Sequence, residues 1–141
     1  MKKISMIRVG SGAILTAILL LGLSCGGLHQ APYGSTLTMP ASTSISSAGD
    51  VIFHVEAVVL DPDSKPLNAV DVDFYVCCGG GDFVDNNGNI LAGPLTVRTD
   101  NIGVAGVDVI VYGDFTGEVS VNADIGTVGA TFKVAKSIPT A

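Results

Sequence analysis

The stretch VIFHVEAVVL, residues 51–60, decides the fold class. Its apolar residues recur at every second position from Val51 to Val59, and side chains of an extended chain point to opposite sides in turn. The intervening positions include His54 and Glu56, so the opposite side is more polar. This period of two, in a segment rich in β-branched residues, predicts a strand with one buried face.

The same alternation returns along the rest of the chain, separated by turn-forming clusters rich in Asp, Gly and Pro. Further strands are expected at 69–77, 95–99, 104–112, 118–125 and 130–136, with an edge strand and turn at 82–89 and a first edge strand from Ser35. The expected inward residues after the first strand are Val70, Val72, Phe74, Val76, Val107, Val109, Val111, Val119, Val121, Ala123, Ile125, Phe132 and Val134. Short strands with turns about every 10 residues predict an all-β Greek-key sandwich.

The N-terminus has the pattern of an export signal. The basic segment MKKISMIR precedes a largely apolar stretch of 15 residues, VGSGAILTAILLLGL. A helix of that length spans about 22 Å, short of the ~30 Å hydrocarbon core of a bilayer. The pattern therefore predicts a signal peptide over 1–24, forming a signal helix, rather than a permanent transmembrane helix.

The segment LGLSCGG, residues 21–27, resembles the bacterial lipobox, although Gly22 stands where that motif usually has Leu. The resemblance implies cleavage before Cys25, lipidation of Cys25 and a membrane partner. Because Gly26 rather than Asp follows the cysteine, it also implies the outer membrane. The alternative is ordinary secretion of a secreted or periplasmic protein, with Cys25 discarded or left as a free thiol.

The residues after Cys25 are rich in Gly, Ser, Thr and Pro. This composition predicts a flexible tether over 25–35, followed by one domain over 36–141.

Four segments in a fixed order resemble the bacterial immunoglobulin-like domains of the intimin and invasin type. They are VLDPDSKPLNAVDVDF (59–74), CGGG (78–81), TDNIGVAGVDV (99–109) and TGEVSVNADIG (116–126). The resemblance covers about residues 36 to 136 and implies an immunoglobulin-like sandwich of about seven strands. It also implies a non-enzymatic module of the cell envelope that serves adhesion, surface interaction or a structural role. The cysteine pair at 77–78 departs from the family, which has small polar residues there.

The charge of the chain excludes one class of partner. Beyond residue 24 four basic residues stand against thirteen acidic ones, a net charge of −9. Such a domain repels phosphate backbones, so nucleic acid is not expected as a partner. The acidity is typical of an exported domain that stays soluble.

Catalytic residues are not expected. His54 is the one histidine of the folded region, and no nucleophile motif or metalloprotease motif occurs. Asp71 and Asp73 lie two apart on one strand face, where a solvated polar face explains them. The sequence therefore predicts no enzyme and no cofactor.

A calcium site is a minor alternative to no metal at all. Asp82, Asp85, Asn87 and Asn89 offer oxygen ligands in one loop, and the last three alternate as at the start of a calcium-binding loop. Gly88 comes one place too early for that loop, and no acidic residue closes it. Zinc at the cysteine pair is disfavoured, because adjacent strand residues point to opposite faces.

The doublet Cys77–Cys78 leaves two states open. In one, the two form a vicinal disulfide. In the other, alternation turns Cys78 inward as a small apolar residue, while Cys77 is exposed and free to crosslink to a partner in an oxidising compartment.

The expected function is therefore that of a lipid-anchored binding or structural module, with another envelope or surface protein as the expected partner. The loops 79–89 and 61–66 are the candidate contact points, and a Greek key can place them at different ends. One alternative is an accessory subunit that binds by strand addition. Another is glycan binding, for which Tyr75 and Tyr112 are the available aromatic platforms.

Overall fold

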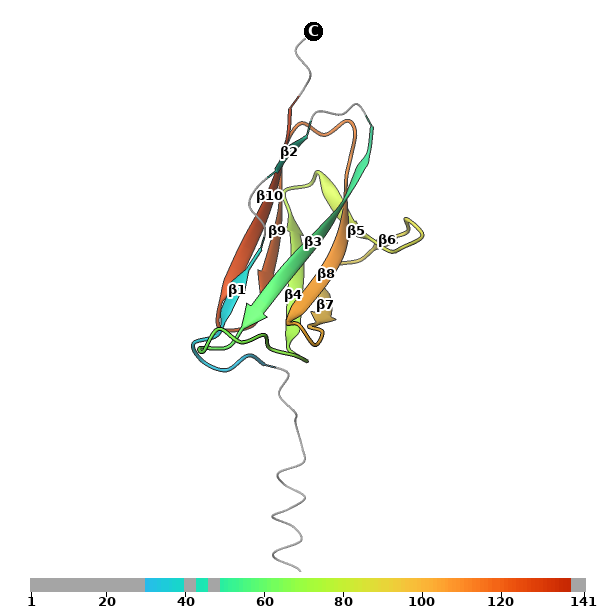
Figure 1. Cartoon of the computed structure of the whole chain (residues 1–141). Helices are drawn as coiled ribbons and strands as arrows, with labels where there is room; N and C mark the ends of the chain where they lie inside the picture. The colour runs from blue at the N-terminus through green and yellow to red at the C-terminus, as the bar shows by residue number, and fades with distance from the viewer. Residues whose placement is uncertain (1–29, 40–42, 46–48, 138–141) are drawn as a thin grey trace, which may run out of the picture.

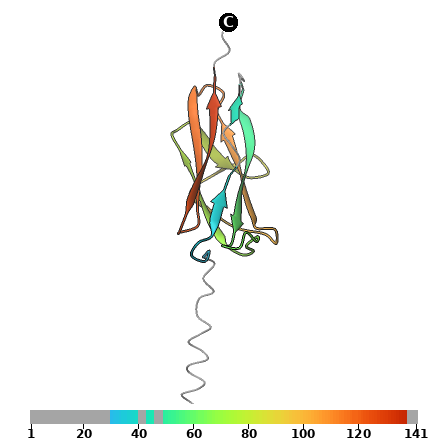
Figure 2. The same ribbon diagram turned by 60° about the vertical axis from the view of Figure 1, so that its left-hand side comes forward.

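The structure, a computed structural model, describes residues 30–39, 43–45 and 49–137. The predicted signal peptide and Cys25 lie outside these residues. The described chain forms two five-stranded sheets that face each other (Figures 1 and 2). Sheet A has the order β1 (Thr36–Thr38), β3 (Val51–Leu60), β8 (Val104–Val111), β5 (Gly81–Val84), β6 (Ile90–Leu91). Sheet B has the order β2 (Thr43–Ile45), β10 (Gly129–Lys136), β9 (Gly117–Asp124), β4 (Asp71–Cys77), β7 (Leu95–Arg98).

The predicted fold class is confirmed: the described chain is an all-β, immunoglobulin-like sandwich. Each strand expected from the alternation is present, and neighbouring strands pair antiparallel except β2, which runs parallel to β10. Two short strands, β2 and β6, were not predicted. They have three and two residues, too few for a period of two to be recognised.

The inward faces are also as predicted. Along β3 the side chains of Val55, Ala57 and Val59 are fully buried, while His54 and Glu56 are exposed. Valine is the commonest buried hydrophobic residue, and Phe74 is the largest fully buried side chain of the described residues. Small β-branched residues suit this core because they pack closely on a pleated surface.

Three turns share one construction, in which an aspartate side chain closes its own loop. The Oδ1 atoms of Asp61, Asp85 and Asp100 each accept hydrogen bonds from the backbone amides two and four residues later, at 2.8 to 3.0 Å. Each aspartate amide also donates to the carbonyl four residues on. These carboxylates are therefore structural groups of the turns as well as charges for solubility.

The fourth position of each of these turns has a positive φ. It is 64° at Ser64, 80° at Gly88 and 77° at Gly103. Glycine adopts this conformation at little cost, whereas a residue with a Cβ does so with strain. At Gly103 there is a second constraint, because an added Cβ would lie 2.7 Å from the carbonyl oxygen of Val59.

The strands run between two ends of the sandwich. Gln30 lies at one end, beside Asp71 at the start of β4 and Gly126 after β9. The loop after β4, residues 78–80, lies at the other end (Figure 1). The candidate contact loops 61–66 and 79–89 therefore start from opposite ends. We refer to these as the near end, with Gln30, and the far end, with residues 78–80.

The domain packs residues that were assigned to the tether. Ala31 and Ser35 are 6% and 7% exposed, and Ala31 belongs to the hydrophobic core. The amide of Ser35 donates to the carbonyl of Pro32 at 3.1 Å, which forms a turn just before β1. Within the described part of the chain, no helix is long and apolar enough to cross a membrane.

The two glycine turns give a matched test. We expect Gly88→Ala to lower the free energy of unfolding by about 1 kcal/mol, because a Cβ there is strained but meets no atom within 4 Å. We expect Gly103→Ala to lower it by about 3 kcal/mol, because the contact with the Val59 carbonyl adds to the same strain. Urea denaturation of both variants measures the difference; equal losses would show that the close approach contributes nothing.

Candidate functional site

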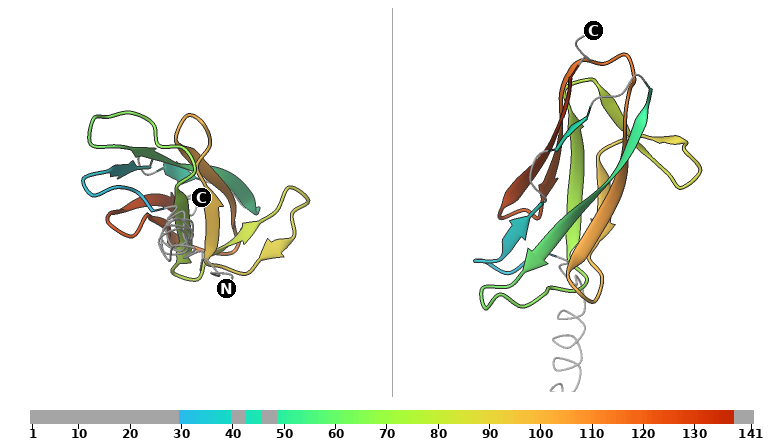
Figure 3. Two further views of the ribbon diagram at one scale, coloured as in Figure 1. Left: turned by 90° about the horizontal axis from the view of Figure 1, so that it is seen from below. Right: turned by 45° about the horizontal axis from the view of Figure 1, so that its top comes forward.

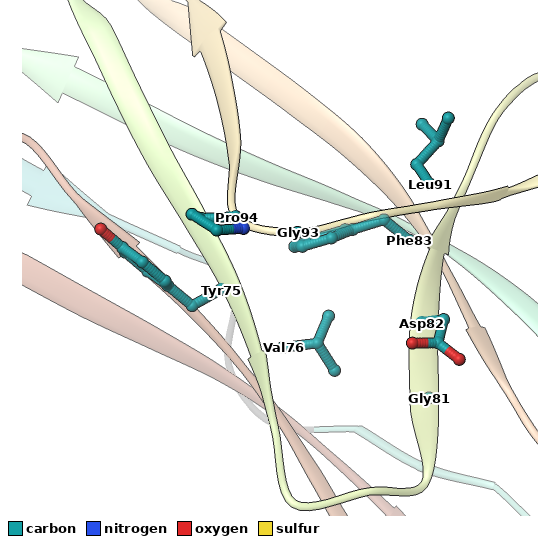
Figure 4. Close-up of a pocket in the computed structure, with 8 residues that line it drawn as sticks. All are labelled: Tyr75, Val76, Gly81, Asp82, Phe83, Leu91, Gly93 and Pro94. Atoms are coloured by element: carbon teal, nitrogen blue, oxygen red, sulfur yellow. The ribbon is translucent and has the colours of Figure 1, made fainter.

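An open cavity of about 280 Å³ lies at the margin of the sandwich between β4 and β5. We call it the side pocket. Every residue that lines it comes from one stretch of the chain, 75–94, in which β5 and β6 form a hairpin (Figure 4). The lining residues are Tyr75, Val76, Gly81, Asp82, Phe83, Leu91, Gly93 and Pro94.

The pocket exists because two strand pairings stop short. β7 pairs with residues 71–74 of β4, and β6 pairs with Phe83 and Val84 of β5. At this margin, within the described chain, no strand covers Tyr75–Cys77 or Gly81–Asp82. The loop 78–80 closes the far side of the gap, and the segment around Gly93 crosses the other side as it returns from sheet A to sheet B (Figure 4).

Glycines hold the walls of the pocket in place. A Cβ on Gly81 would lie 2.5 Å from the carbonyl oxygen of Ile110, so glycine lets β5 approach β8 closely. A Cβ on Gly80 would overlap the ring of Phe115. The glycines of the segment 78–81 therefore set the position of β5.

The lining residues include two aromatic, three aliphatic and one acidic residue. Tyr75 is 43% exposed and lies beside Pro94, whereas Phe83 is almost fully buried (Figure 4). Asp82 is the one charged side chain among the eight lining residues, and it is half-buried. Ile90 and Leu91, both exposed, continue the apolar surface along the projecting hairpin (Figure 3).

Tyr112 orients the carboxylate of Asp82. Its hydroxyl donates a short hydrogen bond of 2.5 Å to Oδ2 of Asp82. This bond is the main reason that the pKa of Tyr112 is raised above 10.0, because ionisation would remove the donated proton and place two negative charges together. Burial and the charge of Asp50 act in the same direction.

Lys136 fixes the loop that carries Tyr112. Its side chain is buried, and Nζ donates to the carbonyl oxygens of Tyr112 and Gly113, at 3.0 and 2.5 Å. The amide of Gly113 donates to Oδ1 of Asp50 at 2.7 Å. The far end is thus ordered by contacts that the spacing of residues along the sequence does not reveal.

The structure joins Cys77 and Cys78 by a disulfide at the far end. Both residues are exposed, so the expectation that Cys78 packs inward is wrong. The reason is that φ at Cys78 is 84°, and a residue in that conformation leaves the extended geometry on which alternation depends. Of the two states left open by the sequence, this structure has the vicinal disulfide.

The four calcium candidates have different hydrogen-bond partners within the described chain. Asp82 faces Tyr112, whereas Asp85, Asn87 and Asn89 form the hairpin turn. Asp85 accepts hydrogen bonds from the side chain of Asn89 and from the amides of Asn89 and Asn87, which lower its pKa below 3.8. Its stabilising effect is therefore present above pH 3.8 and is lost as the pH falls through the lowered value. Within the described ranges, no three His, Cys, Asp or Glu residues are arranged to hold a metal.

The other titratable candidates lie on exposed strand faces. His54 pairs with Asp108 at 2.7 Å and with Glu56 at 3.5 Å, on the outer face of sheet A. Asp71 pairs with Arg98 at 2.9 Å, and Asp73 accepts a hydrogen bond from the Thr96 hydroxyl. Apart from the pair of His54 and Glu56, which lies within β3, these side chains bond across neighbouring strands, which is the usual means of stabilising a sheet surface.

Half of the residues that line the side pocket were not predicted from the sequence. Tyr75 and the loop 79–89 were identified, but Val76, Leu91, Gly93 and Pro94 were not. The dipeptide GP at 93–94, after the short apolar pair IL, was the available sign that the chain turns back across the margin.

Comparisons with known proteins give distant structural similarity. No family model matches the chain, and no curated protein does. The chain is similar to a conjugative transposon lipoprotein from Bacteroides eggerthii, at 13% identity and a TM-score of 0.42, over 72% of this chain and 95% of that chain. It is similar to a CARDB domain from Pyrococcus furiosus in complex with di-metal ions, at 15% identity and a TM-score of 0.39. That match covers 76% of this chain and 92% of the CARDB chain. It is also similar to a chain in the complex of titin M10 with an obscurin-like 1 immunoglobulin domain, at 18% identity and a TM-score of 0.33. That match covers 77% of this chain and 100% of the other chain.

Alkaline titration tests the contact between Asp82 and Tyr112. We expect Asp82→Asn to bring the pKa of Tyr112 down toward 10.0, because the neighbouring negative charge is removed. Since the folded pKa is raised, the stability from this contact is full below pH 10.0 and is lost as the pH rises through the raised value. Ultraviolet absorbance of the phenolate measures it, with Tyr112→Phe to identify the signal; an unchanged titration in Asp82→Asn would contradict the contact.

Thiol labelling tests the disulfide. If the chain is exported, the compartment is oxidising, and we expect Cys77 and Cys78 to resist N-ethylmaleimide in the denatured protein until it is reduced. Mass spectrometry of the peptide that carries both residues counts the labels. Cys77→Ser is the positive control, since it frees Cys78. Labelling of the natural pair before reduction would rule out the bond.

Proposed function

We propose that this protein is a non-enzymatic, immunoglobulin-like module held at the bacterial outer membrane by lipid on Cys25. In this proposal it binds another envelope or surface protein through the side pocket and the adjoining hairpin, in adhesion or in an envelope assembly. The resemblance to lipoprotein signals at 21–27 and to intimin and invasin domains at 59–126 supports the envelope location.

The observation that carries the proposal is the direction of the domain relative to Cys25: one end lies next to the anchor and the other lies away from it. Gln30, five residues after Cys25, lies at the near end beside Asp71 and Gly126. The seven residues of β4 then lead from the near end to the far end, a rise of about 23 Å. If Cys25 carries a lipid, the far end would therefore be directed away from the membrane, together with the part of the side pocket next to residues 78–80.

The chemistry of the pocket favours binding over catalysis. Acid–base or nucleophilic catalysis needs two or more cooperating groups within hydrogen-bond reach. Among the lining residues Asp82 is the single titratable group besides Tyr75, and its described partner, the Tyr112 hydroxyl, serves to orient it. An orienting contact of this kind suits a recognition site.

Strand addition at the same margin is the second candidate. The uncovered edges, Tyr75–Cys77 and Gly81–Asp82, have three and two residues. Strands in proteins usually have about 3 to 10 residues, so a partner strand would gain few backbone hydrogen bonds there. Side-chain insertion into the pocket is therefore favoured over strand addition. Glycan binding is less favoured, because the cavity of about 280 Å³ is small and the Tyr112 hydroxyl is already engaged.

Fractionation and partner capture test the proposal together. We expect the natural protein to incorporate labelled palmitate and to sediment with outer membranes, and Cys25→Ser to lose both properties. We expect Tyr75→Ala to lose most crosslinking to an envelope partner while it stays in the membrane, because Tyr75 is a wall of the pocket.

The matched control is Tyr33→Ala. Tyr33 is 94% exposed and lies close to the near end, outside the side pocket, so its removal should leave capture unchanged. Membrane retention of Cys25→Ser would contradict the anchor. Equal capture by the Tyr75→Ala and Tyr33→Ala variants would contradict binding through the side pocket.

A further inference from the structure

We propose that the Cys77–Cys78 disulfide is a redox switch that sets the conformation of the far end. In the oxidised state the bond holds the start of the crossing from β4 to β5, residues 77–81, in the observed path. When a dithiol reduces the bond, the crossing relaxes, and the loop between β8 and β9 moves with it. This switch requires neither a lipid on Cys25 nor a bound partner, so it goes beyond the proposed function.

The bond does not stabilise the fold in the usual way. A disulfide commonly stabilises a protein by closing a long loop of the unfolded chain, and its effect grows with the length of that loop. Cys77 and Cys78 are adjacent in the sequence, so their bond closes no such loop. Its effect is therefore confined to the conformation of these two residues and of the chain that follows them.

The bond is accessible to a reductant. Cys77 ends β4 at the far end, and both cysteines are exposed. Exposed disulfides are in general the labile and regulatory ones, and their exchange begins when a thiolate attacks one of the two sulfur atoms. A dithiol in solution or on another protein can therefore react with this pair.

The backbone of Cys78 gives the bond something to hold. Its φ is 84°, a conformation that residues with a Cβ rarely adopt. The two other such residues in the described chain, Ser64 and Ala69, have backbone amides that donate to carbonyl groups. Outside the strands of the described chain, no backbone hydrogen bond involves Cys78, and the disulfide is the restraint in its place. Once the bond is broken, φ at Cys78 can return to the negative values that L-residues favour.

Two close contacts carry a change at Cys78 into the domain. A Cβ on Gly80 would overlap the ring of Phe115. A Cβ on Gly81 would lie 2.5 Å from the carbonyl oxygen of Ile110. Because both glycines already lie against their neighbours, a new chain path before them displaces those neighbours rather than being absorbed in the loop.

Tyr112 connects the crossing to the side pocket. Its amide donates to the carbonyl of Gly80 at 3.1 Å, and its hydroxyl donates to Oδ2 of Asp82 at 2.5 Å. Asp82 lines the side pocket. A different path at 78–79 therefore loosens the bond to Gly80, and with it the position of Tyr112 and the orientation of the Asp82 carboxylate.

The reaction is thiol–disulfide exchange. One thiolate of the dithiol attacks a sulfur atom of the pair, the bond between the two cysteines breaks, and a mixed disulfide forms. The second thiol of the dithiol then attacks the mixed disulfide. The pair gains two electrons and two protons and becomes the free thiols of Cys77 and Cys78, while the dithiol is oxidised to its own disulfide.

Hydrogen exchange of single amides tests the switch. The ¹⁵N-labelled full chain, in mild detergent, is measured by NMR in the oxidised state and after reduction with dithiothreitol. We expect the Tyr112 amide to exchange about tenfold faster after reduction, because its bond to Gly80 is loosened. The Gly103 amide, which donates to Asp100 in a turn at the near end, should keep its rate. Reoxidation with oxidised glutathione should restore the first rate of Tyr112.

Two double variants separate the bond from the backbone conformation. Cys77→Ser with Cys78→Ser removes the bond and keeps a Cβ at both positions, so the Tyr112 amide should exchange at the reduced rate with or without dithiothreitol. Cys77→Ser with Cys78→Gly also removes the bond, but glycine adopts a positive φ at little cost, so the rate should lie closer to that of the oxidised protein. The dispersion of the amide spectrum shows whether each variant is folded.

Three results would overturn the inference. The first is an unchanged Tyr112 rate after reduction. The second is an equal rise at Gly103, which would mean that reduction destabilises the whole domain. The third is equal Tyr112 rates in the two double variants, which would mean that the bond does not act through φ at residue 78.

Discussion

The crossing from β4 to β5 is the constraint on which the side pocket depends. Within five residues, 77–81, the chain leaves sheet B, turns at the far end and enters sheet A. Gly81 is required because a Cβ there would collide with the carbonyl of Ile110, and Gly80 because a Cβ there would collide with the ring of Phe115. The disulfide at Cys77–Cys78 joins the two residues at the start of this crossing. This short crossing holds β4 beside β5, so that both strands line the side pocket.

The acidic composition has a structural role that a count of charges does not show. Asp61, Asp85 and Asp100 each close a turn through two backbone amides, and the turn at Asp100 lies beside the tightly packed Gly103. Asparagine would keep the same acceptor oxygen without the charge, so the geometry alone does not require aspartate. A carboxylate, however, makes a stronger hydrogen bond to a backbone amide than a neutral acceptor does. Turn stability and solubility therefore favour the same residue.

The sequence predicted the strands and their faces because those properties are local. Alternation placed Val55, Val72 and Val121 inward, and all three are fully or almost fully buried. The same rule was wrong at Cys78, because a positive φ ends the alternation one residue earlier than the composition indicates. The pocket was missed for a different reason. Its opening depends on the residue of β4 at which pairing with β7 ends and on the residue of β5 at which pairing with β6 ends. The alternation of apolar residues within one strand does not show where its pairing with another strand ends.

The groups of the proposed site would contribute unequally to affinity. Asp82 is half-exposed, and ion pairs in such positions contribute about 1 kcal/mol or less. Burial of one large apolar side chain contributes about 1.5 to 3 kcal/mol. Ile90 and Leu91, exposed on a hairpin that projects from the sandwich, can therefore supply more binding free energy than the carboxylate does. In the proposed function, the apolar hairpin would therefore contribute more to affinity than the carboxylate of Asp82.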